Sequence, residues 1–124
     1  MASGLGGCSF SSRFNVGHVN INSLTNKISE VRSLLISNNV DLLGISESWL
    51  TCDIPDSLVS IGNYNIIRND TPGNIKKHGV EVYIKSISKF EIVDCGLNNV
   101  VIFHLSDLDT YVITVYRPPL YTDI

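Results

Sequence analysis

Residues 14–50, FNVGHVNINSLTNKISEVRSLLISNNVDLLGISESWL, decide the fold of this chain. FNVGHVN alternates loosely between apolar and polar residues, which predicts a strand ending at Asn20. Apolar residues then recur at helical spacing and predict an amphipathic helix over residues 25–37. DLLGIS, residues 41–46, is an apolar run of strand length. Because a helix between two strands usually makes a right-handed crossover, we expect parallel strands that end at one edge of the sheet.

The rest of the chain carries strand patterns only. Short apolar runs follow one another between polar segments: YNIIRN (64–69), GVEVYIK (79–85), FEIVD (90–94), VVIFHL (100–105) and YVITVY (111–116). The last two runs are expected to form an antiparallel hairpin. Both are apolar on nearly both faces, as in strands at the centre of a covered sheet. Since one convincing helix cannot cover both faces, an uncovered sheet face is expected to allow self-association.

Length and composition indicate one folded domain. The chain has 124 residues, of which 44% are hydrophobic and 17% charged, so disordered and low-complexity classes are excluded. Residues 1–13 are rich in Gly and Ser and predict a flexible leader, which leaves residues 14–124 as the domain. The net charge of -3 argues against a protein whose affinity comes mainly from neutralising phosphates.

The chain shows no sign of export or of membrane insertion. Its start lacks a signal-peptide pattern, and no apolar run approaches the ~20 residues of a membrane span. An intracellular protein, cytoplasmic or nuclear and without membrane contact, is therefore expected. Cys8, Cys52 and Cys95 lie far apart and form no CxxC pair, so neither a disulfide framework nor a zinc site is predicted.

Three polar side chains fall at the ends of predicted strands. Asn20 ends the first strand, Glu47 follows the second, and Tyr116 ends the last, directly before Arg117 and two prolines. In open α/β sheets, ligands bind outside the carboxyl ends of the strands. A carboxylate, an amide and a phenol that meet there are suited to holding a hard cation and a phosphate.

Four motifs together carry a family resemblance. HVNINSL (18–24), DLLGISESWL (41–50), GVEVYI (79–84) and VYRPP (115–119), with the helix between the first two, resemble the endonuclease/exonuclease/phosphatase (DNase I-like) family in order and spacing. The likeness is closest to the endonuclease domain that precedes the reverse transcriptase in jockey-type non-LTR retrotransposons, and it covers residues 14–120. It implies the N-terminal half of a four-layer α/β sandwich that cleaves DNA with Mg²⁺ or Mn²⁺.

The resemblance also assigns roles to residues. Asn20 matches the asparagine that positions the scissile phosphate, and Asn22 lies where relatives carry a residue near the outer shell of the metal. Glu47 matches the carboxylate that binds the metal, and Tyr116 matches the tyrosine that contacts the phosphate. Arg68 resembles part of an Arg-x-Asp segment of relatives and is a candidate for DNA contact, although a strand-end ion pair explains it equally well.

The family completes its site with two later motifs, one like Gly-Asp-Phe-Asn and one like Ser-Asp-His. SDLD, at 106–109, has the first two letters of the latter, but no histidine follows. His18 and His104 read as strand residues and His78 as part of a polar loop, so no general base is found. We therefore expect half of a domain that is inactive, or nearly so, by itself.

Two alternatives remain open at this point. The chain could be a non-catalytic remnant of a retroelement, or a piece that depends on a partner to cover its apolar sheet face. It could also keep the fold and act as a phosphatase or another phosphodiesterase, as other branches of the superfamily do.

Overall fold

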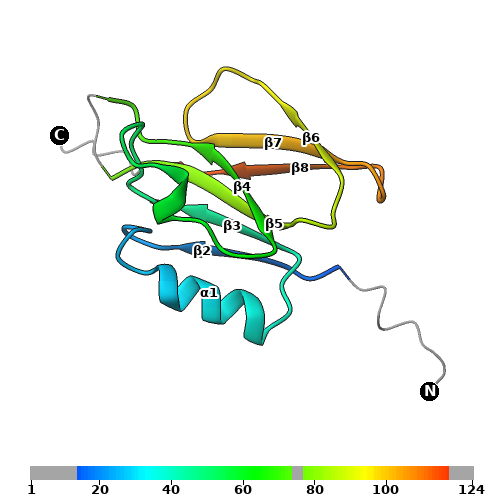
Figure 1. Ribbon diagram of the computed structural model, residues 1–124. Helices are drawn as coiled ribbons and strands as arrows, with labels where there is room; N and C mark the ends of the chain where they lie inside the picture. The colour runs from blue at the N-terminus through cyan, green and yellow to red at the C-terminus, as the bar shows by residue number, and fades with distance from the viewer. Residues whose placement is uncertain (1–13, 74–76, 118–124) are drawn as a thin grey trace.

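The structure, a computed structural model, describes residues 14–73 and 77–117; the predicted leader and the two prolines after Arg117 lie outside these ranges. Its elements are β2 (Val16–Asn20), α1 (Ile28–Ser37), β3 (Leu42–Ser46), the 3-10 helix η2 (Asp56–Leu58), β4 (Tyr64–Asn69), β5 (Val80–Lys85), β6 (Phe90–Val93), β7 (Val100–Leu105) and β8 (Thr110–Val115) (Figure 1). They form two sheets, with strand orders β2-β3-β5-β4 and β6-β7-β8. The expected α/β class, with one β-α-β unit followed by antiparallel strands, is confirmed.

The β-α-β unit forms as predicted. β2 pairs with β3 in parallel, with Asn20 opposite Ser46, so both strands end at the same edge of the sheet. The helix, however, begins at Ile28 and not at residue 25. The preceding residues form a turn instead, in which the Lys27 amide donates to the Leu24 carbonyl at 2.9 Å, and Lys27 itself has a non-helical φ of -132°.

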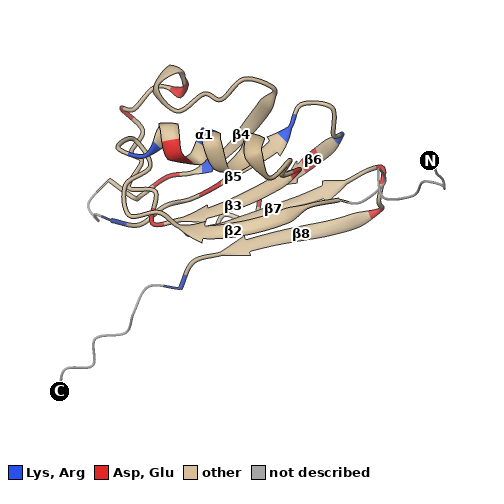
Figure 2. Ribbon diagram, turned by 90° about the horizontal axis from the view of Figure 1, so that it is seen from below, with Lys and Arg blue, Asp and Glu red and all other residues tan. Residues whose placement is uncertain are grey.

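Three layers result from this arrangement. α1 covers one face of the four-stranded sheet, and the three-stranded sheet packs on the other face (Figures 1 and 2). Successive strand residues point to opposite faces, so β5 contributes to both cores. Tyr83 packs on the α1 side with Leu35, whereas Val82 and Ile84 pack between the sheets with Phe103.

The hairpin of β7 and β8 is confirmed, but β8 is not a central strand. In the described part of the chain β8 forms an edge of its sheet. Tyr111, Ile113 and Val115 are 67%, 61% and 53% exposed on the outer face, while Thr114 faces the first sheet and is buried. The prediction from apolar content was wrong here because no described element covers this outer face.

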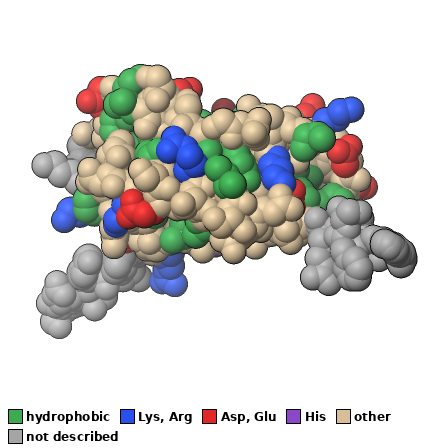
Figure 3. All heavy atoms as spheres, turned by 60° about the horizontal axis from the view of Figure 1, so that its bottom comes forward, with side chains coloured by type: hydrophobic (Ala, Val, Ile, Leu, Met, Phe, Trp, Pro, Cys, Tyr) green, Lys and Arg blue, Asp and Glu red, His purple; other side chains and the backbone are tan. Residues whose placement is uncertain are grey.

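Charged side chains are dispersed over the surface. On the face that Figure 3 shows, with the α1 side turned forward, basic and acidic groups alternate with apolar and neutral ones, and no continuous basic patch forms. The distribution agrees with the net charge of -3. Among the described residues, no helix has the length and apolar character needed to cross a membrane.

Candidate functional site

The loops after β2 and β3 lie against each other at one edge of the first sheet. Asn20 and Ser46 are paired in register and therefore share a face of the sheet, and Glu47 follows directly. The amide of Ser23 donates to the carbonyl of Glu47 at 3.0 Å, which places the loop residue Asn22 beside Glu47 in space. Three of the residues predicted for the site thus come from two adjacent loops.

Tyr116 reaches the same place from the second sheet. It follows β8, and its hydroxyl donates a hydrogen bond to Oε2 of Glu47, 69 residues earlier in the chain. The bond joins the two sheets at the edge where β2 and β3 end. A carboxylate has about four lone-pair sites, so this one hydrogen bond does not use up the capacity of Glu47 to bind a cation.

The backbone at this edge is strained. Four non-glycine residues in the two loops have φ in the left-handed region: Asn22 (48°), Ser23 (83°), Glu47 (54°) and Trp49 (62°). Such conformations cost free energy for residues with a Cβ and persist only where the surroundings impose them. Their grouping around Glu47 supports a functional assignment for this edge.

The segment before β5 adds residues that sequence reasoning missed. The His78 carbonyl accepts a hydrogen bond from the Trp49 amide at 2.8 Å, and the His78 ring contacts Tyr116 edge-on with centroids 5.9 Å apart. The Lys77 ammonium lies 5.3 Å from the centroid of Trp49. Only the antiparallel pairing of β5 with β3 brings this polar loop to Glu47, and composition carries no signal of that pairing.

Glu81 lies directly behind the site, inside the protein. It is 0% exposed, lies in register between Ile45 and Arg68, and neither of its carboxyl oxygens has a hydrogen-bond partner among the described residues. Burial raises the pKa of Glu81 to about 9, with Asp70 adding to the rise and Ser48 and the Arg68 charge opposing it. At neutral pH this carboxyl is uncharged and does not compete with Glu47 for a cation.

Arg68 is held away from the Glu47–Tyr116 pair. Its guanidinium donates to Asp70 at 3.0 and 2.8 Å, to Asp56 at 2.8 Å and to the carbonyl of Thr51 at 3.2 Å. These bonds, those with Asp70 first, raise its pKa further. Of the two interpretations of Arg68, the structure shows the strand-end ion pair.

The donor set suits a weakly held magnesium ion and no softer metal. In the ranges 14–73 and 77–117, no group of three or more His, Cys, Asp or Glu residues gathers to hold a metal. Glu47 supplies one carboxylate, and Asn20 and Asn22 belong to the neighbouring chain segment, which the backbone pairing brings next to the Glu47 loop. Mg²⁺ typically keeps several waters and takes one or two carboxylates, so these oxygen ligands fit a partial site.

A histidine–aspartate pair does exist, but it lies elsewhere. Nε2 of His104 is 2.9 Å from Oδ1 of Asp109, close to the turn between β7 and β8. That turn is at the opposite end of both strands from Tyr116. The pair cannot act as a base for chemistry at Glu47.

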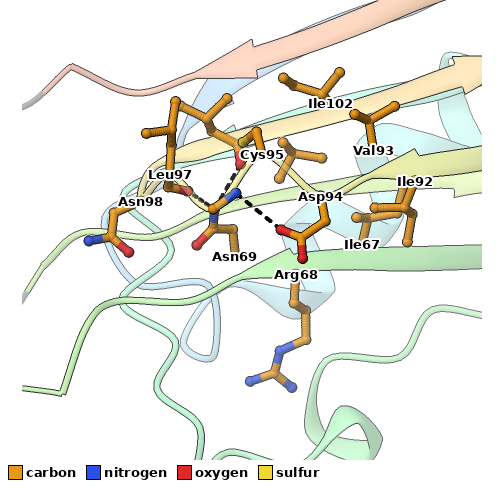
Figure 4. A pocket seen from close by; sticks show the side chains of 13 residues that line it. Ile67, Arg68, Asn69, Ile92, Val93, Asp94, Cys95, Leu97, Asn98 and Ile102 are labelled. Atoms are coloured by element: carbon orange, nitrogen blue, oxygen red, sulfur yellow. Dashed lines mark hydrogen bonds between the residues drawn. The ribbon is translucent and has the colours of Figure 1, made fainter.

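The pocket in Figure 4 is also distinct from this site. It has a volume of about 370 Å³ and lies between β4 and the connection from β6 to β7, with Ile67, Ile92 and Ile102 in its wall. Asn69 closes one end by donating to the carbonyls of Leu97 and Val100, each at 2.7 Å. The Arg68 side chain points away from this pocket.

No protein-family model and no curated protein matches the chain. Solved structures do. An AP endonuclease from Archaeoglobus fulgidus is 17% identical with a TM-score of 0.63, over 86% of this chain and 42% of its own. AP endonuclease LMAP from Leishmania major is 17% identical with a TM-score of 0.65, over 86% and 41%. The 3′ phosphatase NExo from Neisseria, bound to a product DNA hairpin, is 21% identical with a TM-score of 0.63, over 84% and 41%.

These similarities establish the fold. The chain has the DNase I-like fold of these proteins, and it spans about two-fifths of the length of the proteins it matches. At such identities the likeness does not extend to activity.

Proposed function

We propose that this chain supplies the metal-binding part of a phosphodiesterase site, that of a DNA endonuclease of a jockey-type non-LTR retrotransposon acting inside the cell. The observation that supports it best is the hydrogen bond between Tyr116 and Glu47, formed across two sheets at the edge where β2 and β3 end. Those two residues and Asn20 are the ones that the family motifs single out.

Each residue has a distinct role in this proposal. Glu47 would hold Mg²⁺, with the Asn20 and Asn22 amides near it, and the ion would stabilise negative charge on the phosphate when bound. The Tyr116 hydroxyl, which now donates to Glu47, would donate to a non-bridging phosphate oxygen. Asn20, exposed at the end of β2, would orient the phosphate.

The chain alone is expected to cleave DNA weakly or not at all. Among the residues that the structure describes, none is placed at Glu47 to activate water, since His104 and Asp109 lie at the other end of β7 and β8. His78 contacts Tyr116, but its Nδ1 is buried without a hydrogen-bond partner among the described residues. In this proposal the general base therefore comes from outside the described residues.

Metal binding is the sharpest test because it needs no complete site. The protein has one tryptophan, Trp49, two residues from Glu47, so its fluorescence reports Mn²⁺ binding at this edge. We expect Glu47→Gln to abolish the Mn²⁺-dependent change, and Glu91→Gln, on exposed β6, to preserve it. A titration that is identical in wild type and Glu47→Gln would refute the metal site.

Nicking of supercoiled plasmid with Mg²⁺ or EDTA tests the reaction itself. We expect no more than background cleavage by wild type. Cleavage that needs Mg²⁺ and disappears in Glu47→Gln would show that the missing base is not required. Release of phosphate from a 3′-phosphorylated oligonucleotide would instead favour the phosphatase alternative, which the NExo likeness makes worth including.

A second candidate role is partner-dependent assembly through the outer face of β8. Tyr111, Ile113 and Val115 expose apolar surface side by side on an edge strand. Sedimentation should then give a mass that rises with concentration, and Ile113→Lys should abolish the rise. A concentration-independent monomer would exclude self-association.

A further inference from the structure

Glu47 and Tyr116 belong to a closed circuit of hydrogen bonds that runs through Asn99. The Tyr116 amide donates to the Asn99 carbonyl at 2.9 Å, and Oδ1 of Asn99 accepts from the Gly79 amide at 3.1 Å. The Gly79 carbonyl in turn accepts from the Ser48 amide at 3.3 Å, and Ser48 is covalently joined to Glu47. The bond from the Tyr116 hydroxyl to Glu47 completes the circuit.

Asn99 is suited to this place by its backbone and by its burial. Its φ of 61° lies in the left-handed region, which asparagine tolerates better than most residues. It is 8% exposed, so the bond from Gly79 is formed away from water. Loss of the side-chain oxygen would leave the Gly79 amide buried without an acceptor.

The circuit of hydrogen bonds fixes how the two sheets are aligned relative to each other. The two sheets pack through apolar side chains, and apolar contacts do not fix direction. Hydrogen bonds do, and Asn99 joins the loop before β5 in the first sheet to the residue that ends β8 in the second. The separation of Glu47 from Tyr116 is therefore set by Asn99 as well as by their own contact.

We propose that Asn99 is a positioning residue that holds the Glu47 loop and Tyr116 in register through the Gly79 amide. Its catalytic meaning rests on the proposed function, but its structural effect does not. Neither Asn99 nor Gly79 touches the metal or the phosphate in this scheme; both act through Ser48 and Tyr116. The sequence motifs single out neither residue for such a role.

Three variants distinguish the effect of the Asn99 side-chain amide from the effect of the left-handed backbone conformation. Asn99→Gly keeps the left-handed conformation and removes the acceptor, whereas Asn99→Asp keeps an acceptor at Oδ1. Asn63→Gly is the matched control, because Asn63 has φ of 70° in an exposed turn at the opposite edge. Each is measured by amide hydrogen exchange, by Trp49 emission without metal, and by Mn²⁺ titration.

We expect Asn99→Gly to accelerate exchange at Gly79, to shift Trp49 emission, and to weaken Mn²⁺ binding by about ten- to hundredfold, as for residues that orient metal ligands. Asn99→Asp should restore exchange and emission, and Asn63→Gly should match wild type. Faster exchange at Gly79 with unchanged emission and Mn²⁺ affinity would overturn the proposal. The hydrogen bond from Gly79 to Asn99 would then be lost without any displacement of Glu47 and Trp49.

Two measurements keep the proposal testable if Asn99→Gly does not fold. In wild type the Gly79 amide must exchange slowly, and fast exchange there would overturn the proposal. Tyr116→Phe cuts the circuit at the other end, so it should shift Trp49 emission while leaving Gly79 protected. If wild type binds no Mn²⁺, the proposed function fails, whereas the emission and exchange results still decide the role of Asn99.

Discussion

The two edges of the sheets at which the strands begin and end differ in which residues adopt the left-handed backbone conformation. At the edge opposite the site, the non-glycine residues with positive φ are Asn39, Asn63 and Asp109, all of types that tolerate this conformation. At the site edge they include a Ser, a Glu, a Trp and a Lys, at positions 23, 47, 49 and 77. One edge is made of ordinary turns, and the other keeps strained residues in place.

The difference indicates that the site edge keeps conformations that lower the stability of the fold. The site edge also carries buried polar atoms without hydrogen-bond partners among the described residues, at Trp49, Thr71, His78 and Glu81. Such groups lower stability and in natural proteins concentrate where another requirement outweighs folding. Substitutions that remove an unpartnered polar group or a strained conformation at the site edge should therefore stabilise the protein more than matched ones elsewhere.

The largest effect is expected at Glu81. Its pKa is about 9 in the folded protein and 4.5 in an ordinary setting, so between these values the folded state holds a proton that the unfolded state has released. The free energy of unfolding must then fall as pH rises from 4.5 to 9. Glu81→Gln removes this dependence and should be more stable than wild type by about 3 kcal/mol at pH 7, with little difference at pH 4.

Urea unfolding at pH 4, 7 and 9 measures this effect. Glu91→Gln on the exposed β6 strand is the control and should follow the wild-type pH profile. Asp70 and Arg68 also influence Glu81, and they are present in both proteins. If wild type and Glu81→Gln keep the same difference at all three pH values, Glu81 is charged in the folded protein and the site edge stores no such penalty.

A smaller effect, this time a loss of stability, is expected from Tyr116→Phe. The hydroxyl bonds to the Glu47 carboxylate in a partly buried position, so its removal should lower the free energy of unfolding by about 1 kcal/mol. Tyr111→Phe is the matched control on the same β-hairpin, because Tyr111 is exposed and its hydroxyl bonds to no carboxylate among the described residues. Equal denaturant midpoints for the two variants would mean that the contact between Tyr116 and Glu47 is not kept in solution.

The sequence predicted which residues would meet at the site edge, but not what holds them there. Helical periodicity between two strand patterns implied parallel strands, and that alone places Asn20 beside Glu47. Tyr116 followed from its place at a strand end. His78 and Asn99 could not be found in this way, because their contacts depend on how β5 pairs and how the second sheet packs. Periodicity determines which face of a strand is buried and leaves its neighbours undetermined.

The outer face of β8 shows the same limit. Its apolar residues predicted a covered strand, yet composition does not say whether the covering element belongs to this chain. The helix start shows it locally, since Leu24, just before the predicted start, is bonded to a loop more than 20 residues later and a turn from Leu24 to Lys27 replaces the first predicted helical residues. Tertiary contacts override a local preference of well under 1 kcal/mol per residue with ease.

The smallest effect on stability is expected at Lys77, where it reports the backbone strain at the site edge. Lys77 has φ of 65°, and its side chain is exposed over the Trp49 ring. Lys77→Gly should relieve strain of about 1 kcal/mol and lose a cation–π contact of about 0.5 kcal/mol, a small net gain in stability. Asn63→Gly, at φ of 70° on the other edge, relieves little because asparagine already tolerates that conformation, and should change stability by a few tenths. Thermal unfolding of both variants decides the matter, since a gain for Asn63→Gly as large as that for Lys77→Gly would mean that the two edges are equally strained.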